Sequence, residues 1–314
     1  MSQNIIWITG AQGFIGGNLV QKLRKAGHRP VGFVRKDTAL SPRQGACPLY
    51  PLSPEGLSAA IAQRGMPARV YPLAGGPTVG RSIADPHSDF LANVATTEIL
   101  LEALHNLKQR VPVVLASSAA VYGSYHDEPI KTSAKHAPSS PYGYHKLIAE
   151  QLVRSHAESF GLPVTIYRLF SIYGPGLRKQ LLFDACIRLA AASSGEALEL
   201  GGTGAERRDW LHVNDVTAAM IAVADPAPGE VSLFNLASGD STEIRTVANG
   251  LVKAWGDSRS VTFSGMSRVG DPFSLVADRG SLPPGFSPSL SLTVGLSEFV
   301  AWFREFGVNN ERGQ

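Results

Sequence analysis

Short, continuously apolar runs alternate along the chain with longer segments whose apolar residues recur every three or four positions. The apolar runs that we interpret as strands lie at 5–9, 31–34, 69–74, 113–118, 164–170 and 233–237. A short apolar run rich in β-branched residues is typical of a parallel strand that is buried on both faces. Helices are expected between the first run and Gly27, at 57–62, at 86–108, after Pro141, at 218–224 and at 296–306. Predicted strands and helices therefore follow each other through most of the chain, and residues 38–69 are its least regular part.

A glycine-rich segment joins the first predicted strand to the first predicted helix. Its sequence is Gly10-Ala11-Gln12-Gly13-Phe14-Ile15-Gly16. Glycines in such a turn let backbone amides approach a pyrophosphate, and the N-terminus of the helix that follows attracts the negative charge. A tight turn without a ligand could also use glycines, but the position between a strand and a helix favours a dinucleotide-binding site.

Arg35 follows the second predicted strand, where a side chain is expected to contact the adenosine ribose of a bound dinucleotide. An acidic side chain there binds the 2′-hydroxyl of NAD, whereas an arginine accommodates the 2′-phosphate of NADP. Arg35 is followed by Lys36, and an acid appears only at Asp37. The sequence therefore leaves NAD and NADP open and leans towards NADP, unless Arg35 is an ordinary charge on a solvated loop.

The candidate catalytic residues are Ser118, Tyr142 and Lys146. Tyr142 and Lys146 are four residues apart at the start of a predicted helix, so they share one face. An ammonium group close to a tyrosine favours the phenolate and lowers the tyrosine pKa towards the range useful for acid–base catalysis. Ser118 ends a predicted strand, and ligands bind at the carboxyl ends of strands in doubly wound sheets. A common surface pair and a turn-forming serine are the structural alternatives.

Composition and charge narrow the class of protein. Hydrophobic residues make up 44% and charged residues 18% of the 314 residues, which is typical of a globular protein. The net charge of +3, without a basic run, gives no indication of nucleic-acid binding. Cys47 and Cys186 lie far apart without metal-ligand spacing, so neither a disulfide framework nor a metal site is expected. The apolar runs are too short for a membrane span and no leader pattern precedes the first strand, so we expect a cytoplasmic protein.

Seven ordered motifs resemble those of the extended short-chain dehydrogenase/reductase family, in particular its nucleotide-sugar epimerases and dehydratases. Residues 9–16 are similar to the family's Thr-Gly-x-x-Gly-x-x-Gly motif, and 141–146 are similar to its Pro-Tyr-x-x-Ser-Lys signature. Residues 117–123 resemble the serine motif, most of all that of sugar 4-epimerases. The other motifs are Leu73-Ala74-Gly75 with Ser82, Asp85-Pro86 and Asn93, then 168–176, 208–213 and 268–271. The resemblance covers almost the whole chain.

The resemblance implies an α/β fold, with a doubly wound parallel sheet (a Rossmann domain) and a smaller C-terminal α/β substrate domain. It places the dinucleotide domain at 1–173, completed by about 212–240, and the substrate-binding domain at 174–211 and 241–314. The residues that it implies for NAD or NADP are Gly10, Gly13, Phe14, Ile15, Gly16, Arg35, Leu73, Ala74, Gly75, Asn93, Ser117, Tyr142, Lys146 and Phe170. The residues that it implies for a nucleotide-diphosphate-sugar substrate are Ser118, Ser171, Arg208 and Arg268. Arg208 and Arg268 suit the substrate diphosphate, because the forked guanidinium of an arginine matches phosphate geometry. The resemblance also implies a homodimer.

Departures from the family pattern bear on the predicted reaction. Arg35 replaces the usual acid, and Pro51 falls near the place of an aspartate that usually contacts adenine, which weakens the expectation of NAD. Ser171 stands where many members have an asparagine that touches the substrate, so the sugar pocket is expected to differ. Ala119 and Ala120 follow Ser118 in place of the Asp-Glu pair that 4,6-dehydratases use as acid and base, so dehydration is disfavoured.

The resemblance therefore implies an NAD(P)-dependent nucleotide-sugar epimerase that acts at sugar C4 through a 4-keto intermediate. Tyr142 would act as the base, Ser118 would hold the substrate oxygen, and Lys146 would hold the nicotinamide ribose. One alternative is an NADPH-dependent reductase of 4-keto-6-deoxy nucleotide sugars, which Arg35 favours. A second alternative is a non-catalytic dinucleotide-binding protein, against which the intact catalytic set argues.

Overall fold

The described part of the chain, in the computed structural model, comprises residues 3–35, 47–76, 78–124, 129–193, 195–266 and 272–307. The chain divides into two compact units, each built from separate stretches of sequence. The first unit is Met1–Gly123, Thr132–Leu169 and Thr217–Asn235, and the second is Ser124–Lys131, Phe170–Val216 and Leu236–Gln314.

A seven-stranded sheet with the strand order β11-β6-β5-β4-β1-β2-β3 forms the centre of the first unit. Neighbouring strands from β3 to β6 pair in parallel. The strands are β1 (Ile5–Thr9), β2 (Arg29–Val34), β3 (Leu49–Pro51), β4 (Arg69–Pro72), β5 (Val113–Ser118), β6 (Val164–Leu169) and β11 (Val231–Leu236). The strand order reverses between β1 and β4, so the predicted doubly wound α/β fold is confirmed.

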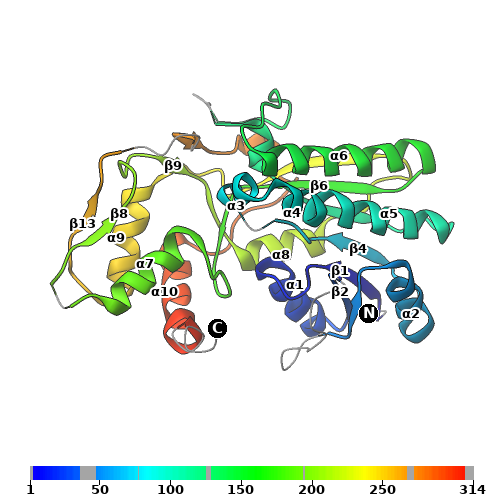
Figure 1. Ribbon diagram of the computed structural model, residues 1–314, viewed down its shortest axis with the longest axis horizontal. Coiled ribbons are helices and arrows are strands. Elements are labelled where there is room, and N and C mark those ends of the chain that lie inside the picture. The colour runs from blue at the N-terminus through cyan, green and yellow to red at the C-terminus, as the bar shows by residue number, and fades with distance from the viewer. Residues whose placement is uncertain are drawn as a thin grey trace. The chain divides into compact units, whose positions relative to one another are not determined.

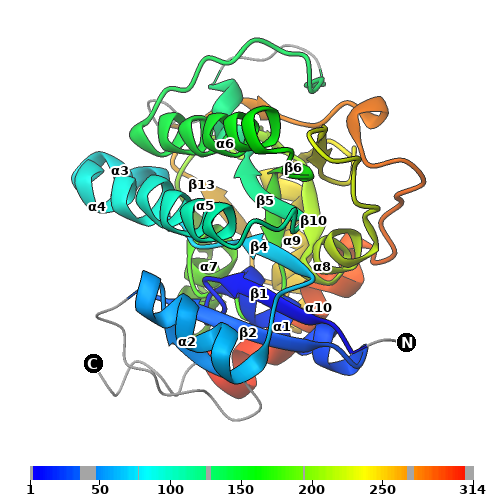
Figure 2. The same ribbon diagram turned by 90° about the vertical axis from the view of Figure 1, so that its right-hand side faces the viewer.

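Helices cover both faces of this sheet (Figure 1). Figure 2 shows α2, α5 and α6 on one face, where their apolar side chains join one buried cluster, and α1 and α8 on the other. The helices are α1 (Phe14–Lys25), α2 (Pro54–Arg64), α3 (Val79–Ala84), α4 (Pro86–Phe90), the π-helical η1 (Leu91–Ala95), α5 (Thr96–Asn106), the short η2 (Ala119–Tyr122), α6 (Pro141–Phe160) and α8 (Val213–Ala222). Because both faces are covered, strand residues such as Trp7 and Ile8 are fully buried although they point in opposite directions.

The second unit is the smaller α/β part that the sequence predicted. Its core contains the contact between α9 and α10, where Leu251 and Phe299 are fully buried. Its elements are β7 (Ser171–Tyr173), α7 (Gln180–Ala191), β8 (Leu198–Leu200), β9 (Arg207–Arg208), β10 (Trp210–His212), β12 (Thr242–Glu243), α9 (Ile244–Ala254), β13 (Val261–Phe263), β14 (Ser274–Leu275), η3 (Arg279–Ser281), α10 (Leu292–Trp302) and η4 (Phe303–Gly307). The strands pair as β10-β7, β12-β9-β14 and β13-β8.

Several predicted elements need correction. The single helix expected at 86–108 is α4, η1 and α5 in succession, because the backbone widens to π-helical hydrogen bonding within Leu91–Ala95. The sequence analysis missed β3, a three-residue edge strand that ends at Pro51, where a proline is tolerated. The helices α3, α7 and α9 were also missed. The helix expected at 57–62 is longer, since Ser53 caps its start at Pro54.

A buried charged network connects β5, β6 and α6. Arg168 and Glu150 are both fully buried, with Arg168 Nη2 2.7 Å from Glu150 Oε2 and Nε 2.9 Å from Oε1. Ser117 Oγ donates to Glu150 Oε1 at 2.5 Å. Arg168 Nη1 donates to the Tyr122 hydroxyl at 3.0 Å, and that hydroxyl donates to Asn235 Oδ1 at 2.6 Å. Buried charges of this kind need such partners, so the network fixes α6 against the strands that it covers.

We expect Arg168→Met to lower the free energy of unfolding by about 3–5 kcal/mol, because it leaves the Glu150 carboxylate buried without its counter-charge. Arg207→Met is the matched control, since Arg207 and Glu243 form an exposed pair at 3.7 Å that is worth about 0–1 kcal/mol. Urea denaturation of both variants measures the difference. Equal, small losses in the two variants would contradict this account of the network.

Candidate functional site

The turn after β1 is held against the end of β4. Gly10 has a φ of +67°, and a Cβ at this position would lie 2.9 Å from the Ala74 nitrogen. Thr9 Oγ1 accepts hydrogen bonds from the backbone N–H groups of Leu73 at 3.1 Å and of Ala74 at 3.0 Å. A glycine is required at position 10, because only glycine combines this left-handed backbone with so close an approach. The turn and the end of β4 therefore form one continuous wall.

The N-terminus of α1 lies next to this turn. Gly13 is its N-cap residue and makes no side-chain capping hydrogen bond, and the first turn, which contains Phe14 and Ile15, carries no acidic residue. A Cβ at Gly16 would lie 2.2 Å from the Gly10 oxygen, so the helix lies directly on the turn. The first-turn amides and the helix dipole favour an anion at such a place. The segment 10–16 thus fits a phosphate group.

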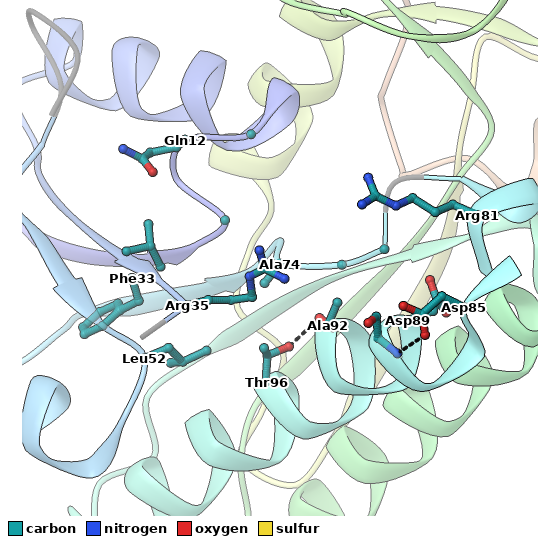
Figure 3. A pocket seen from close by; sticks show the side chains of 16 residues that line it. Gln12, Phe33, Arg35, Leu52, Ala74, Arg81, Asp85, Asp89, Ala92 and Thr96 are labelled. Carbon is teal, nitrogen blue, oxygen red and sulfur yellow. Dashed lines mark hydrogen bonds between the residues drawn. The ribbon is translucent and has the colours of Figure 1, made fainter. Parts of the chain in front are cut away.

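A cavity of about 310 Å³ lies beside this turn, entirely within the first unit (Figure 3). Its lining includes Gly10, Gly13, Ala74 and Gly75, four of the residues that the resemblance implies for a dinucleotide. Arg35, which directly follows β2, also lines the cavity.

Arg81 of α3 brings a second guanidinium group to the same cavity (Figure 3). The sequence analysis missed Arg81. Its only sequence signal is a positive charge next to Ser82, in the segment that follows β4.

The structure brings Ser118, Tyr142 and Lys146 together at the end of β5 and the start of α6. Ser118 Oγ accepts from the Ala120 N–H at 3.2 Å, and the Ser118 side chain is also hydrogen-bonded to Tyr142. Lys146 is buried, and its Nζ donates to the Ala116 carbonyl oxygen at 3.0 Å. The same Nζ lies 5.8 Å from the centroid of the Tyr142 ring. A serine, a tyrosine and an ammonium group therefore meet at a strand end.

The start of α6 is fixed by its own capping and by α3. Ser140 is the N-cap, and its Oγ accepts from the Gly143 N–H at 3.3 Å, while Pro141 occupies the first helical turn. The Tyr142 N–H donates to Oγ of the fully buried Ser82 at 3.1 Å. These bonds fix the backbone of the tyrosine before any ligand arrives.

Burial raises the pKa of Tyr142 above its ordinary value, and the Asp89 charge adds to this, whereas the hydrogen bond with Ser118 acts in the opposite direction. We expected Lys146 to lower this pKa, whereas the net direction is upward. The physical reason is that loss of solvent disfavours the phenolate, and the Lys146 ammonium group donates to the Ala116 oxygen.

The Gly75-Gly76 segment runs along α4 and η1. A Cβ at Gly75 would lie 2.8 Å from Asn93 Oδ1 and 3.0 Å from Lys146 Nζ. A Cβ at Gly76 would lie 1.7 Å from Asp89 Oδ1, so a side chain there would force the Asp89 carboxylate to move. Asn93 Nδ2 in turn donates to the Asp89 carbonyl oxygen at 2.9 Å. Gly75 and Asn93 were named from the sequence, but Asp89, an acid four residues before Asn93, was missed.

The remaining predicted residues make contacts of their own. The Ser117 hydroxyl is directed to Glu150 in the network described above. In the second unit, Phe170 is buried, and the Ser171 N–H donates to the Asp209 carbonyl oxygen at 3.0 Å. Arg268 lies outside the described residues.

Arg208 lies on β9, and its neighbour Asp209 fixes this strand. The fully buried Asp209 carboxylate accepts from the Ser238 N–H and Oγ, both at 2.6 Å, through Oδ1. Its Oδ2 accepts from the N–H groups of Gly239 at 2.9 Å and Ala277 at 3.2 Å. Arg208 Nη1 donates to the neighbouring Arg207 carbonyl oxygen at 2.9 Å. One carboxylate therefore ties together the strand that carries Arg208 and the loops beside it.

The described residues show neither a metal-binding cluster nor a membrane-spanning helix. Among those residues, no group of three or more histidine, cysteine, aspartate or glutamate side chains could hold a metal ion. None of their helices combines the length and the apolar character needed to cross a membrane.

A family model, related sequences and a solved structure all match this chain. A sequence model described as the NAD dependent epimerase/dehydratase family matches residues 6–237. The chain is 30% identical over 297 residues to a UDP-glucose 4-epimerase of Azospirillum brasilense, covering 87% of this chain and 83% of the relative. It is also 30% identical over 319 residues to a dTDP-glucose 4,6-dehydratase of Streptomyces griseus, covering 95% and 93%. Among solved structures, MoeE5 in complex with UDP-glucuronic acid and NAD matches with a TM-score of 0.81 at 29% identity, covering 96% of this chain and 99% of that chain.

Gly10→Ala should weaken dinucleotide binding about tenfold or more, because a side chain at this φ costs on the order of 1–3 kcal/mol and pushes the turn away from Ala74. Gly80→Ala is the matched control, since a Cβ at Gly80 of α3 meets open space. Calorimetric titration of both variants with NAD and with NADP measures the effect. Unchanged affinity in Gly10→Ala would show that this turn does not hold the dinucleotide.

Proposed function

This chain belongs to the NAD dependent epimerase/dehydratase family, and we propose that it epimerises a nucleotide sugar at C4 with a bound nicotinamide dinucleotide. The meeting of Ser118, Tyr142 and Lys146 at the end of β5 carries the proposal. The family comprises enzymes that act on nucleotide sugars, and one relative of this chain is a UDP-glucose 4-epimerase.

The first unit has the chemistry that a nicotinamide dinucleotide needs. The turn at 10–16 offers backbone amides and a helix N-terminus to the pyrophosphate, and Arg35 supports the 2′-phosphate of NADP. The related MoeE5 structure contains NAD, so both dinucleotides stay in the proposal. The bound nicotinamide supplies reversible hydride transfer at the sugar C4.

Side chains of this chain transfer the proton and bind the substrate oxygen. Tyr142, as phenolate, accepts the proton of the C4 hydroxyl and returns it after the keto sugar has turned over. Ser118 holds the same oxygen by a hydrogen bond, and Lys146 holds the nicotinamide ribose. Because burial raises the pKa of Tyr142, activity should increase with pH as the phenolate forms.

A 4-keto sugar reductase is the second candidate, since Arg35 lines the cavity and an NADPH-dependent reductase needs such a residue. Dehydration remains disfavoured, although one relative is a dTDP-glucose 4,6-dehydratase, because Ala119 and Ala120 offer no acid–base pair. The complete catalytic set argues against a non-catalytic dinucleotide-binding protein.

For the substrate, we propose that Arg208 and Arg268 bind the diphosphate and that Ser171 contacts the sugar. Arginine forks match phosphate oxygens, and the buried Asp209 supports the strand that carries Arg208. Relatives described with UDP-glucose and UDP-glucuronic acid make uridine diphosphate the first nucleotide to test.

A homodimer is also part of the proposal. The helices α3, α4 and α6 pack on one another within the first unit and expose large apolar side chains. The exposed fraction is 63% for Ile83, 54% for Tyr144, 46% for Leu91, 40% for Ile148 and 39% for Phe90. Gathered apolar exposure of this kind is typical of a protein–protein interface, and a second copy of the chain is the partner that we propose.

Tyr142→Phe should lower turnover about 10²–10⁴-fold while dinucleotide affinity stays near that of the wild type, because only the base is lost. Tyr144→Phe is the matched control, since this exposed tyrosine lies on the same helix outside the catalytic set. Interconversion of UDP-glucose and UDP-galactose, followed by NMR, is the assay. Wild-type turnover in Tyr142→Phe would eliminate this residue as the base.

Arg35→Asp should weaken NADP binding by about 10–100-fold and improve NAD binding, because a charge-assisted hydrogen bond contributes on the order of 1.5–3 kcal/mol and an acid repels the 2′-phosphate. Arg29→Asp, at the opposite end of β2, should leave both affinities unchanged. Titrations with both dinucleotides at fixed salt give the answer. A wild-type preference for NAD that the mutation does not move would leave Arg35 as a surface charge.

A further inference from the structure

Asp89 and the partly buried His145 form a pair between α4 and the candidate catalytic helix α6. Asp89 is 4% exposed on α4, and its Oδ2 lies 2.6 Å from Nδ1 of His145 on α6. The distance is short for a hydrogen bond between a nitrogen and an oxygen, so the imidazole ring holds this carboxylate firmly. His145 stands where the family signature has a serine, so the resemblance assigns no role to this pair.

The second oxygen of Asp89 faces the dinucleotide cavity wall. Asp89 Oδ1 is buried without a hydrogen-bond partner among the described residues, and it lies against Gly76. Asp89 and Gly76 both line the 310 Å³ cavity. A buried carboxylate with one unpartnered oxygen is costly, and its retention beside a ligand cavity suggests a role beyond stability.

The pair also places titratable groups close to Tyr142. His145 follows Tyr142 by three residues on α6 and directly precedes Lys146, so all three belong to its first two turns. The titratable and charged groups on the elements packed around Tyr142 include Lys146 and His145 on α6, Asp89 on α4 and Arg81 on α3. Ser118, at the end of β5, contributes a neutral hydrogen bond.

We propose that Asp89 and His145 are positioning residues that hold the Tyr142–Lys146 face of α6 against the cavity wall and balance the charge beside the tyrosine. The inference rests on the proposed role of Tyr142. A negative charge near a phenol disfavours its phenolate, and the hydrogen bond with His145 partly neutralises the charge of the Asp89 carboxylate. The two partners therefore act on Tyr142 in opposite directions.

The two single variants should accordingly shift the ionisation of Tyr142 in opposite directions. Asp89→Asn removes the negative charge, lowers the pKa of Tyr142 and moves the acidic limb of the kcat/KM profile to lower pH by about one unit. His145→Gln removes the imidazole hydrogen bond from the Asp89 carboxylate, which raises the pKa of Tyr142 and moves the limb to higher pH. Glu158→Gln, which removes an exposed charge from the far part of α6, should leave the limb in place.

The experiment measures two readouts in the full-length wild type and the three variants. The first is the pH profile of kcat/KM for sugar-nucleotide conversion. The second is the tyrosinate absorption titration, with the Tyr142→Phe spectrum subtracted, which needs no activity. NAD and NADP affinities and thermal midpoints, measured alongside, identify a variant that has simply lost its fold.

Opposite shifts of the tyrosinate titration in Asp89→Asn and His145→Gln support the inference. Shifts in the same direction, or no shift in variants that fold and bind dinucleotide, overturn it. If the chain converts no nucleotide sugar but the titration still moves in opposite directions, the proposed reaction fails while the positioning role stands.

Discussion

The bonds between α6 and the end of β5 are the constraint on which the site depends. Tyr142, Lys146 and Glu150, on successive turns of α6, bond to residues 116–118 at the end of β5. Two of these contacts, those of Lys146 and Glu150, are buried, so sliding the helix by one turn would leave charged groups without partners. The position of the tyrosine relative to the strand end therefore follows from packing and is in place before a ligand binds.

Burial also affects the ionisation of Tyr142, on which the proposed chemistry depends. Partial burial of Tyr142 disfavours its phenolate, so only a small fraction of the residue is ionised at neutral pH, although that fraction is a strong base. The groups around it act in both directions, with Ser118 favouring the phenolate and Asp89 opposing it. The Asp89 carboxylate also lies so close to Gly76 on the cavity wall that a side chain there would displace it. One carboxylate thus connects the wall proposed to hold the dinucleotide with the helix proposed to carry the base.

Local sequence patterns predicted the sheet and the glycine turn, because a buried strand and a left-handed Gly10 leave their signals within a few residues. The four-residue spacing of Tyr142 and Lys146 is equally local. The pairs formed by Asp89 with His145 and by Glu150 with Arg168 join residues that are distant in sequence, and no pattern reports them. The effect of Lys146 on the tyrosine was misjudged for the same reason, since burial and the Ala116 contact are properties of the folded chain.

Conversion of a C4-labelled sugar nucleotide tests the central claim most directly. UDP-glucose carrying deuterium at C4 is incubated with the purified protein, and the product is analysed by NMR. Epimerisation at C4 predicts UDP-galactose that keeps the deuterium at C4, formed more slowly than from unlabelled substrate, because the same hydrogen leaves and returns. UDP-galactose formed with loss of the label, or conversion of a 4-keto sugar nucleotide at the expense of added NADPH without epimer formation, would contradict the account.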